Sequence, residues 1–300
     1  MTTKPKVAPN LLAQKAVLAS VFTSRWGAQR IDRDITEEVH AKHKASKDAG
    51  RYSKLLVERK DLAPVRSVRM AARDFHFHMT LPWTDKKGQR LLPSANYMKY
   101  AAAMREFQQQ FEAAADEFEK NFPDMVKRAK LRLNGMFNAD DYPDPAEIRK
   151  EFSFKVEILP CPDASDFRVD VAAEHLDEMR QGVEQRMREV LENTTRDTAD
   201  RITDVVGKMA ERPKAYKPGT GDDRAEGTFR DSLVENVREL AAVLPSFNLT
   251  GNAKLASITK KIETELCTTE PDILRDNEAV RAKVAKAADK ILTDVASFMT

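Results

Sequence analysis

Two histidines alternate with two phenylalanines in the stretch RDFHFHMTLPWTDKKGQRLLP, residues 73–93. On a strand, His76 and His78 would share a face and could bind one metal ion, whereas on a helix they point about 200° apart and cannot. The apolar residues from position 64 onward recur at helical spacing, and Pro82 ends that pattern. The sequence therefore predicts a helix end at which Phe75 and Phe77 pack, rather than a metal site.

A second group of metal-ligating residue types lies within two helical turns: Glu37, Glu38, His40 and His43. Such a cluster on one helix could bind a divalent ion. Three lysines surround it, at positions 42, 44 and 47, and they favour an exposed, solvated helix face instead.

Common catalytic and phosphate-binding motifs are absent. The sequence contains no G-x-x-x-x-G-K-[ST], G-x-G-x-x-G, G-x-S-x-G or H-E-x-x-H. Cys161 and Cys267 lie far apart without a Cys-x-x-Cys spacing, so we expect small buried hydrophobes and not a disulfide or zinc site. The sequence predicts no catalytic residue, no metal and no cofactor, while an enzyme that uses scattered residues stays open.

The net charge of +2 conceals an uneven distribution. Residues 1–100 contain 20 Lys or Arg against 9 Asp or Glu, whereas residues 101–300 contain 30 against 39. A basic third of this kind can attract phosphates, or it can pair with acidic surfaces of the same chain or of a partner.

The candidate contact residues lie in the second half of this basic third. Arg66, Arg69 and Arg73 are spaced as one stripe of a helix, which could follow a nucleic-acid backbone. A Trp in the loop after Pro82 could stack a base, although such a residue more often anchors its loop. The predicted nucleic-acid or partner contacts are Arg66, Arg69, Arg73, Trp83, Lys86, Lys87 and Arg90.

Two long apolar seams predict the body of the fold, which is mainly α. The first has steps of three and four residues from Tyr97 to Phe118 and continues to about residue 137; the second runs from Ala172 to Met209. We expect the two helices to pair as a long antiparallel hairpin resembling a coiled coil. Alternating residues at 152–159 and 166–171 predict a small β-hairpin inserted between them.

Four segments follow from these patterns. Residues 1–94 form a basic helical region, with helices expected at 11–23, 34–49 and 50–60 and after Pro64. Residues 95–211 form the helical hairpin, with its β insertion at about 152–171, and 212–227 form a linker rich in Pro and Gly. Residues 228–300 form a unit of three helices: 229–244, a second capped by Thr250 or Asn252 that ends at Leu266, and 272–299.

The chain also resembles a phage and bacterial family of unknown function, often encoded near MoxR-type AAA+ ATPases and von Willebrand A-type proteins. The shared pattern is H…TLPW.D..G.RLLP…Y, a long helix, F…DYP, F.F, LP.P…DFRV, a second long helix, FRDS.VEN…L and LRDNEAVR, and it covers residues 20–298. The resemblance implies a phage or phage-related origin and work beside an ATPase, and it supplies no catalytic residues.

These observations predict a non-catalytic helical protein that acts through macromolecular interaction, as an oligomeric assembly or as an adaptor, with its own copies or a protein partner such as an AAA+ ATPase. The alternative is a nucleic-acid-binding protein of a phage replication or recombination system that uses the basic N-terminal third. No apolar run approaches the length of a membrane span, so we expect a cytoplasmic protein, in the host cytoplasm if it is phage-encoded.

Overall fold

The computed structural model describes residues 11–83, 88–163, 173–216 and 230–299. It is mainly helical with a small antiparallel sheet, which confirms the predicted class. The chain forms two compact units: unit 1 comprises Met1–Ser20, Met79–Met98 and Ile158–Thr300, and unit 2 comprises Val21–His78 and Lys99–Glu157. The units do not follow the four expected segments, because residues 1–94 and 95–211 each contribute to both.

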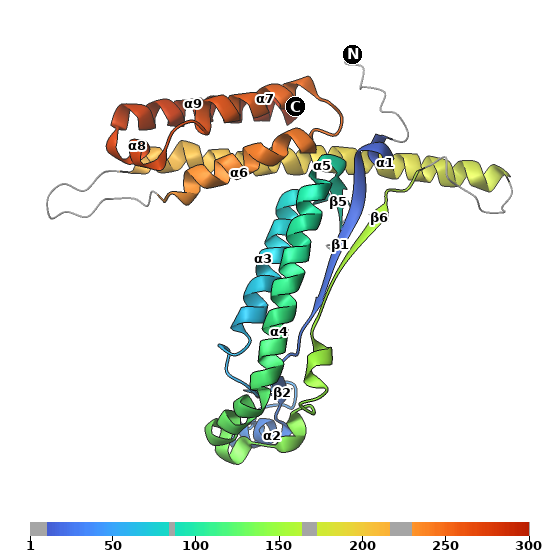
Figure 1. Cartoon of the computed structure of the whole chain (residues 1–300), viewed down its shortest axis with the longest axis vertical. Helices are drawn as coiled ribbons and strands as arrows, with labels where there is room; N and C mark the ends of the chain where they lie inside the picture. The colour runs from blue at the N-terminus through green and yellow to red at the C-terminus, as the bar shows by residue number, and fades with distance from the viewer. Residues whose placement is uncertain (1–10, 84–87, 164–172, 217–229, 300) are drawn as a thin grey trace. The chain divides into compact units, whose positions relative to one another are not determined.

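Unit 1 is built on a long helix, α5 (Ala173–Ala215), which packs mainly against α9 (Glu278–Met299) and α6 (Ser232–Phe247), as Figure 1 shows. Its core includes Ile202 and Met209 of α5, Leu244 of α6 and Ile291 of α9, all essentially inaccessible to solvent. The remaining C-terminal elements are α7 (Ala253–Lys261), a π-helical turn (Ile262–Leu266) and α8 (Pro271–Asp276).

Two C-terminal predictions need correction. The helix expected at 272–299 is interrupted at Asn277, whose extended backbone ends α8 and whose side chain accepts a hydrogen bond from the Val280 amide at the start of α9. Helix α5 continues through Pro213 to Ala215, so the first four residues of the linker expected at 212–227 are helical. Residues 217–229 lie outside the described residues.

The cap of α7 confirms one of the two expected residues. The Asn252 carboxamide oxygen accepts hydrogen bonds from the Lys254 amide at 2.9 Å and the Leu255 amide at 3.2 Å. We expect Asn252→Ala to lower the free energy of unfolding by about 1 kcal/mol, because these amides lose their acceptor. Urea unfolding followed by circular dichroism measures the loss. Asn252→Asp keeps an acceptor and is the control; equal loss in both variants would contradict the role of the cap.

A four-stranded sheet has the order β4-β5-β1-β6, comprising β1 (Ala16–Ser24), β4 (Leu81–Pro82), β5 (Gln89–Pro93) and β6 (Ser153–Pro160). β1 pairs with β5 in antiparallel register, from Ala16 opposite Pro93 to Ser20 opposite Gln89. The helix predicted at 11–23 was therefore wrong beyond α1 (Leu11–Lys15). Pairing with a strand some 70 residues later overrides the local helical spacing, and no window of sequence contains that partner.

The strand predicted at 152–159 is confirmed as β6, and its neighbour in the sheet is β1. The second strand of the expected hairpin, at 166–171, falls outside the described residues. β6 is thus part of a sheet assembled from distant segments rather than of a local insertion.

Unit 2 is organised around α3 (Ala63–Met79) and most of α4 (Tyr97–Leu133), which pack together through Phe75 and Phe107, with ring centroids 5.8 Å apart (Figure 1). α3 confirms the predicted helix that ends before Pro82. α4 continues through Pro123 without a break. Short 3-10 helices precede and follow α4, at Ser94–Asn96, Asn134–Met136, Ala139–Asp141 and Ile148–Glu151.

The seam of α4 is buried within unit 2. Phe122 packs edge-on against Trp26 at 5.4 Å, and Phe118 lies 5.2 Å from Phe152 of the segment that leads into β6. Phe111 contacts Phe154 in the same way, at 5.6 Å. Since α5 packs on α6 and α9 in unit 1, the hairpin that pairs the two long helices is not confirmed.

The rest of unit 2 is a small subassembly at the chain segment 29–55. It contains α2 (Arg33–His43) and a two-stranded sheet in which β2 (Gln29–Ile31) pairs antiparallel with β3 (Ser53–Leu55). The helix predicted at 34–49 ends early, because Lys44 adopts a left-handed conformation (φ 49°) that ends the hydrogen-bonding pattern. The helix predicted at 50–60 was wrong, since β3 and turns occupy that range.

Candidate functional site

The predicted contact residues that the structure describes are divided between the two units. Arg66 and Arg73 are exposed on α3 and Arg69 is half-buried, all in unit 2. Trp83 and Arg90 belong to unit 1, and both are only 8 % exposed. Lys86 and Lys87 lie outside the described residues.

Arg90 is held in the interior by the sheet. Its position in β5 is opposite Ala19 of β1 and Pro82 of β4. Its Nε donates to Thr80 Oγ1 at 2.7 Å, and burial, with the neighbouring Arg201, lowers the pKa of its guanidinium to about 10. The buried Arg90 and Trp83 do not present their side chains at the surface as a contact role requires, because strand pairing turns this segment inward.

The alternating histidines lie on a helix, α3, as the sequence predicts. His76 is buried in α3, and its Nδ1 lies 2.7 Å from the Tyr100 hydroxyl of α4. Burial raises the pKa of the Tyr100 hydroxyl well above its usual value. Across the described ranges, no three His, Cys, Asp or Glu side chains gather as a metal site. Burial also raises the pKa of the Cys161 thiol to about 12, so this cysteine stays a neutral thiol at pH 7.

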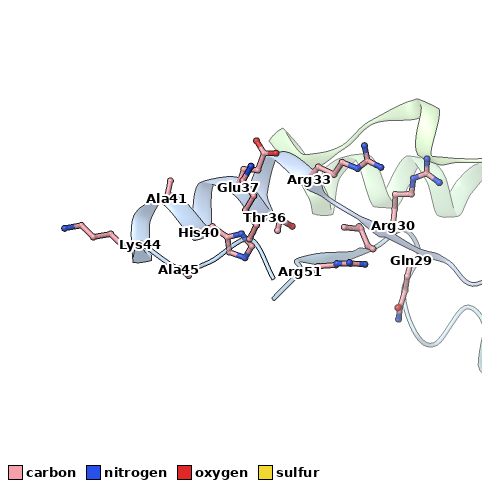
Figure 2. A pocket seen from close by; sticks show the side chains of 12 residues that line it. Gln29, Arg30, Arg33, Thr36, Glu37, His40, Ala41, Lys44, Ala45 and Arg51 are labelled. Atoms are coloured by element: carbon pink, nitrogen blue, oxygen red, sulfur yellow. The ribbon is translucent and has the colours of Figure 1, made fainter. Parts of the chain in front are cut away.

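An open groove of about 1470 Å³ lies between α2, β2 and the segment that leads into β3, and we call it the basic groove (Figure 2). Among the residues that the structure describes, a single carboxylate, that of Glu37, lines it. Five Lys or Arg residues line it as well: Arg30, Arg33, Lys44, Lys47 and Arg51.

The charged residues of helix α2 are divided between the face that lines the groove and the rest of the helix. Its lining residues occupy one face, at successive steps of three, one, three, one and three: Arg33, Thr36, Glu37, His40, Ala41 and Lys44. Two further carboxylates of this helix, Asp34 and Glu38, do not line the groove. Asp48, whose pKa is lowered mainly by a hydrogen bond from Ser46, interacts with His40 but is not a lining residue either. Of the cations in the helix and its C-cap, Arg33 and Lys44 thus line the groove, whereas Lys42 does not.

Hydrogen bonds fix the start of α2 against β3, since the helix itself has no buried residue. The Asp32 carboxylate accepts from the Ile35 amide at 3.2 Å and caps the helix. The Asp32 amide donates to the Tyr52 carbonyl at 3.0 Å, and the Tyr52 amide donates to Thr36 Oγ1 at 3.0 Å. These bonds hold the two sides of the groove at a set separation.

A buried lysine adds to the hydrogen bonds that hold the start of α2 in place. Lys54 Nζ lies 3.0 Å from Asp32 Oδ2 and 2.8 Å from Asp141 Oδ2, and it donates to the Met136 carbonyl at 2.8 Å. Burial favours the neutral amine, but the hydrogen bonds to Asp141 and Asp32 outweigh it and raise the pKa of Lys54. The hydrogen bond from Lys54 in turn lowers the pKa of Asp32. Lys54 therefore ties the start of α2 to the segment that follows α4.

Most cations of the groove have no ion-pair partner among the described residues. Arg30 Nε lies 3.5 Å from Asp141 Oδ1, in a pair whose arginine side chain is 65 % exposed. Within the described part of the chain, Arg33, Lys44, Lys47 and Arg51 form no ion pair, and all four are exposed. An arrangement of this kind can bind a polyanion through several phosphate contacts.

The sequence pattern predicts a solvated helix for this surface and does not predict a groove. The sequence does contain a signal for the groove. Arg33, His40 and Lys44 lie on one face of the helix, whereas Asp34 and Glu38 lie outside that face. The fold adds Arg30 and Arg51, which the β2–β3 pairing brings to the same surface.

No protein-family model, no curated protein and no solved structure matches the chain. The described helices include none that combines the length and the apolar character of a membrane span.

Proposed function

We propose that the protein binds nucleic acid through its phosphate backbone, with the basic groove as the contact surface. The observation that carries the proposal is that the described lining of the groove has five cations against one carboxylate. Four of these cations lack an ion pair among the described residues, so phosphates can approach them without displacing an internal partner.

The proposal predicts strongly salt-dependent binding. Five phosphate contacts correspond to a fall in affinity of about 500-fold between 50 and 200 mM salt. Fluorescence anisotropy with labelled 20-base-pair and 20-nucleotide DNA at both salt concentrations measures it. Absence of binding at 50 mM salt, or binding that ignores salt, would contradict the proposal.

A protein partner or a second copy of the chain is the second candidate. It is favoured by the first part of α5, where the seam residue Met179 is 40 % exposed and Val183 is half-buried. Later seam residues such as Ile202 and Met209 are buried within unit 1, so the seam available to a partner is short. Light scattering without DNA separates the candidates, since self-association gives a mass above 33.9 kDa. The phage setting and the ATPase rest on the resemblance alone.

A further inference from the structure

A second hollow, of about 350 Å³, adjoins the basic groove in unit 2, and Gln29 lines both. Three arginines line this second hollow: Arg25, Arg59 and Arg66. Arg66 begins the α3 stripe, so the second hollow connects the groove with the arginines that the sequence singled out.

The acidic residues beside the second hollow are occupied by other cations. Glu58, which lines it, pairs with Lys60 at 2.9 Å and with Arg128 at 3.4 Å, and these partners lower the pKa of Glu58. Asp61 pairs with Arg128 at 2.7 Å. Over the ranges that the structure describes, Arg59 and Arg66 have no ion pair.

The α3 stripe extends the positive surface. Arg66, Arg69 and Arg73 cover about 10 Å of helix at 1.5 Å per residue. The guanidinium carbon of Arg73 lies 5.5 Å from the centre of the Phe77 ring, which orients this side chain. The groove, the second hollow and the stripe therefore form a succession of cations within one unit.

Neither hollow is lined by a Phe, Tyr or Trp side chain among the described residues. Proteins that hold single strands stack the bases on aromatic side chains, whereas contacts to phosphates alone suit a duplex, whose bases are already stacked. The surface thus has the means to hold a duplex backbone and lacks the usual means to hold unstacked bases.

We infer that the basic groove, the second hollow and the α3 arginines form one track for duplex nucleic acid, which the protein binds without base readout. This inference rests on the proposed function. It assigns Arg66 and Arg73 to the part of the track that only a longer duplex reaches.

The test compares two ligands: a hairpin with a six-base-pair stem, about 20 Å long, and a 20-base-pair duplex, about 68 Å long. We expect Arg66→Gln with Arg73→Gln to weaken binding of the long duplex about 60-fold at 0.1 M salt, since each lost phosphate contact costs about 8-fold. Binding of the short stem should change by less than about 2-fold. Comparison of each variant with the unaltered protein on the same ligand removes the effect of duplex length on site number.

The matched control is Lys120→Gln with Lys130→Gln, which removes two exposed cations of α4 that line neither hollow. It should leave both affinities within about 2-fold. The track is overturned if the Arg66 and Arg73 variant binds the long duplex as the unaltered protein does. The duplex assignment is overturned if a 20-nucleotide thymidine strand binds as tightly as the duplex. Failure of the unaltered protein to bind any of these DNAs at 50 mM salt instead contradicts the proposed function itself.

Discussion

Charge reversal of Arg33, Lys47 and Arg51 to Glu is expected to weaken duplex binding at least 500-fold at 0.1 M salt. These three residues line the basic groove and are exposed, and among the described residues they form no ion pair. Loss of three phosphate contacts gives about 8-fold for each, and the new carboxylates add repulsion. The slope of log affinity against log salt should also fall by about 3. Anisotropy titrations at several salt concentrations provide both quantities.

The control must carry the same change in net charge. Lys42, Lys120 and Lys130 are exposed and do not line the groove, so their reversal to Glu alters the total charge equally. We expect a loss of less than about 10-fold in this control, because only the long-range field changes. Equal loss in both variants would show that net charge, and not the groove, governs binding. Circular dichroism should be unchanged, since Arg33, Lys47 and Arg51 have no internal partner among the described residues to lose.

The sequence predicts those parts of the fold whose stability is local. α3 follows from apolar spacing and from its proline positions, α4 follows from apolar spacing despite its internal Pro123, and Asn252 follows from the chemistry of helix caps. β1 could not be predicted in this way, because AVLASVFTS becomes a strand only through pairing with β5. Similarly, the seams of α4 and α5 predict that each helix has a partner without specifying which element supplies it. Helices α6 and α9 are that partner for α5.

The same distinction between local helix structure and tertiary pairing applies to the candidate site. The stripe Arg66, Arg69 and Arg73 is a property of one helix, and its placement on the surface of α3 agrees with the spacing. A count of charges does not distinguish Arg90 from these three arginines, but Arg90 is buried because it lies in β5. The basic groove requires β2 and β3 to pair, which brings Arg30 near the approach to β3. Tertiary pairing therefore decides which basic residues face a ligand.

Replacement of Lys54 with Met should lower the free energy of unfolding by about 3 kcal/mol, because it leaves two carboxylates without their shared cation. Asp32 and Asp141 are each only 11 % exposed, and Lys54 is the closest cation to both in the described structure. The same variant should weaken duplex binding, since the start of α2 loses its tie to the segment after α4. Urea unfolding and anisotropy measure the two effects.

A combined variant tests this cause directly. Asp32→Asn and Asp141→Asn, added to Lys54→Met, remove the uncompensated charge, and Asn keeps the cap of α2. We expect this triple variant to regain at least half of the lost stability; equal stability of the single and triple variants would contradict the electrostatic explanation.

The contribution of this network should also depend on pH with a definite sign. Asp32 has its pKa lowered below 3.8, so its share is present above that pH and is lost as the pH falls through the lower, folded value. Lys54 has its pKa raised above 10.5, so its share is present below that pH and is lost as the pH rises through the higher, folded value. Without Lys54 the pKa of the nearly buried Asp32 carboxyl rises, so it takes up a proton at a higher pH in the variant than in the unaltered protein. The stability difference between the unaltered protein and Lys54→Met should therefore be constant from about pH 7 to pH 9 and should shrink as the pH falls below about 5. A difference that does not shrink at acidic pH would indicate that this ion network does not hold α2 in place.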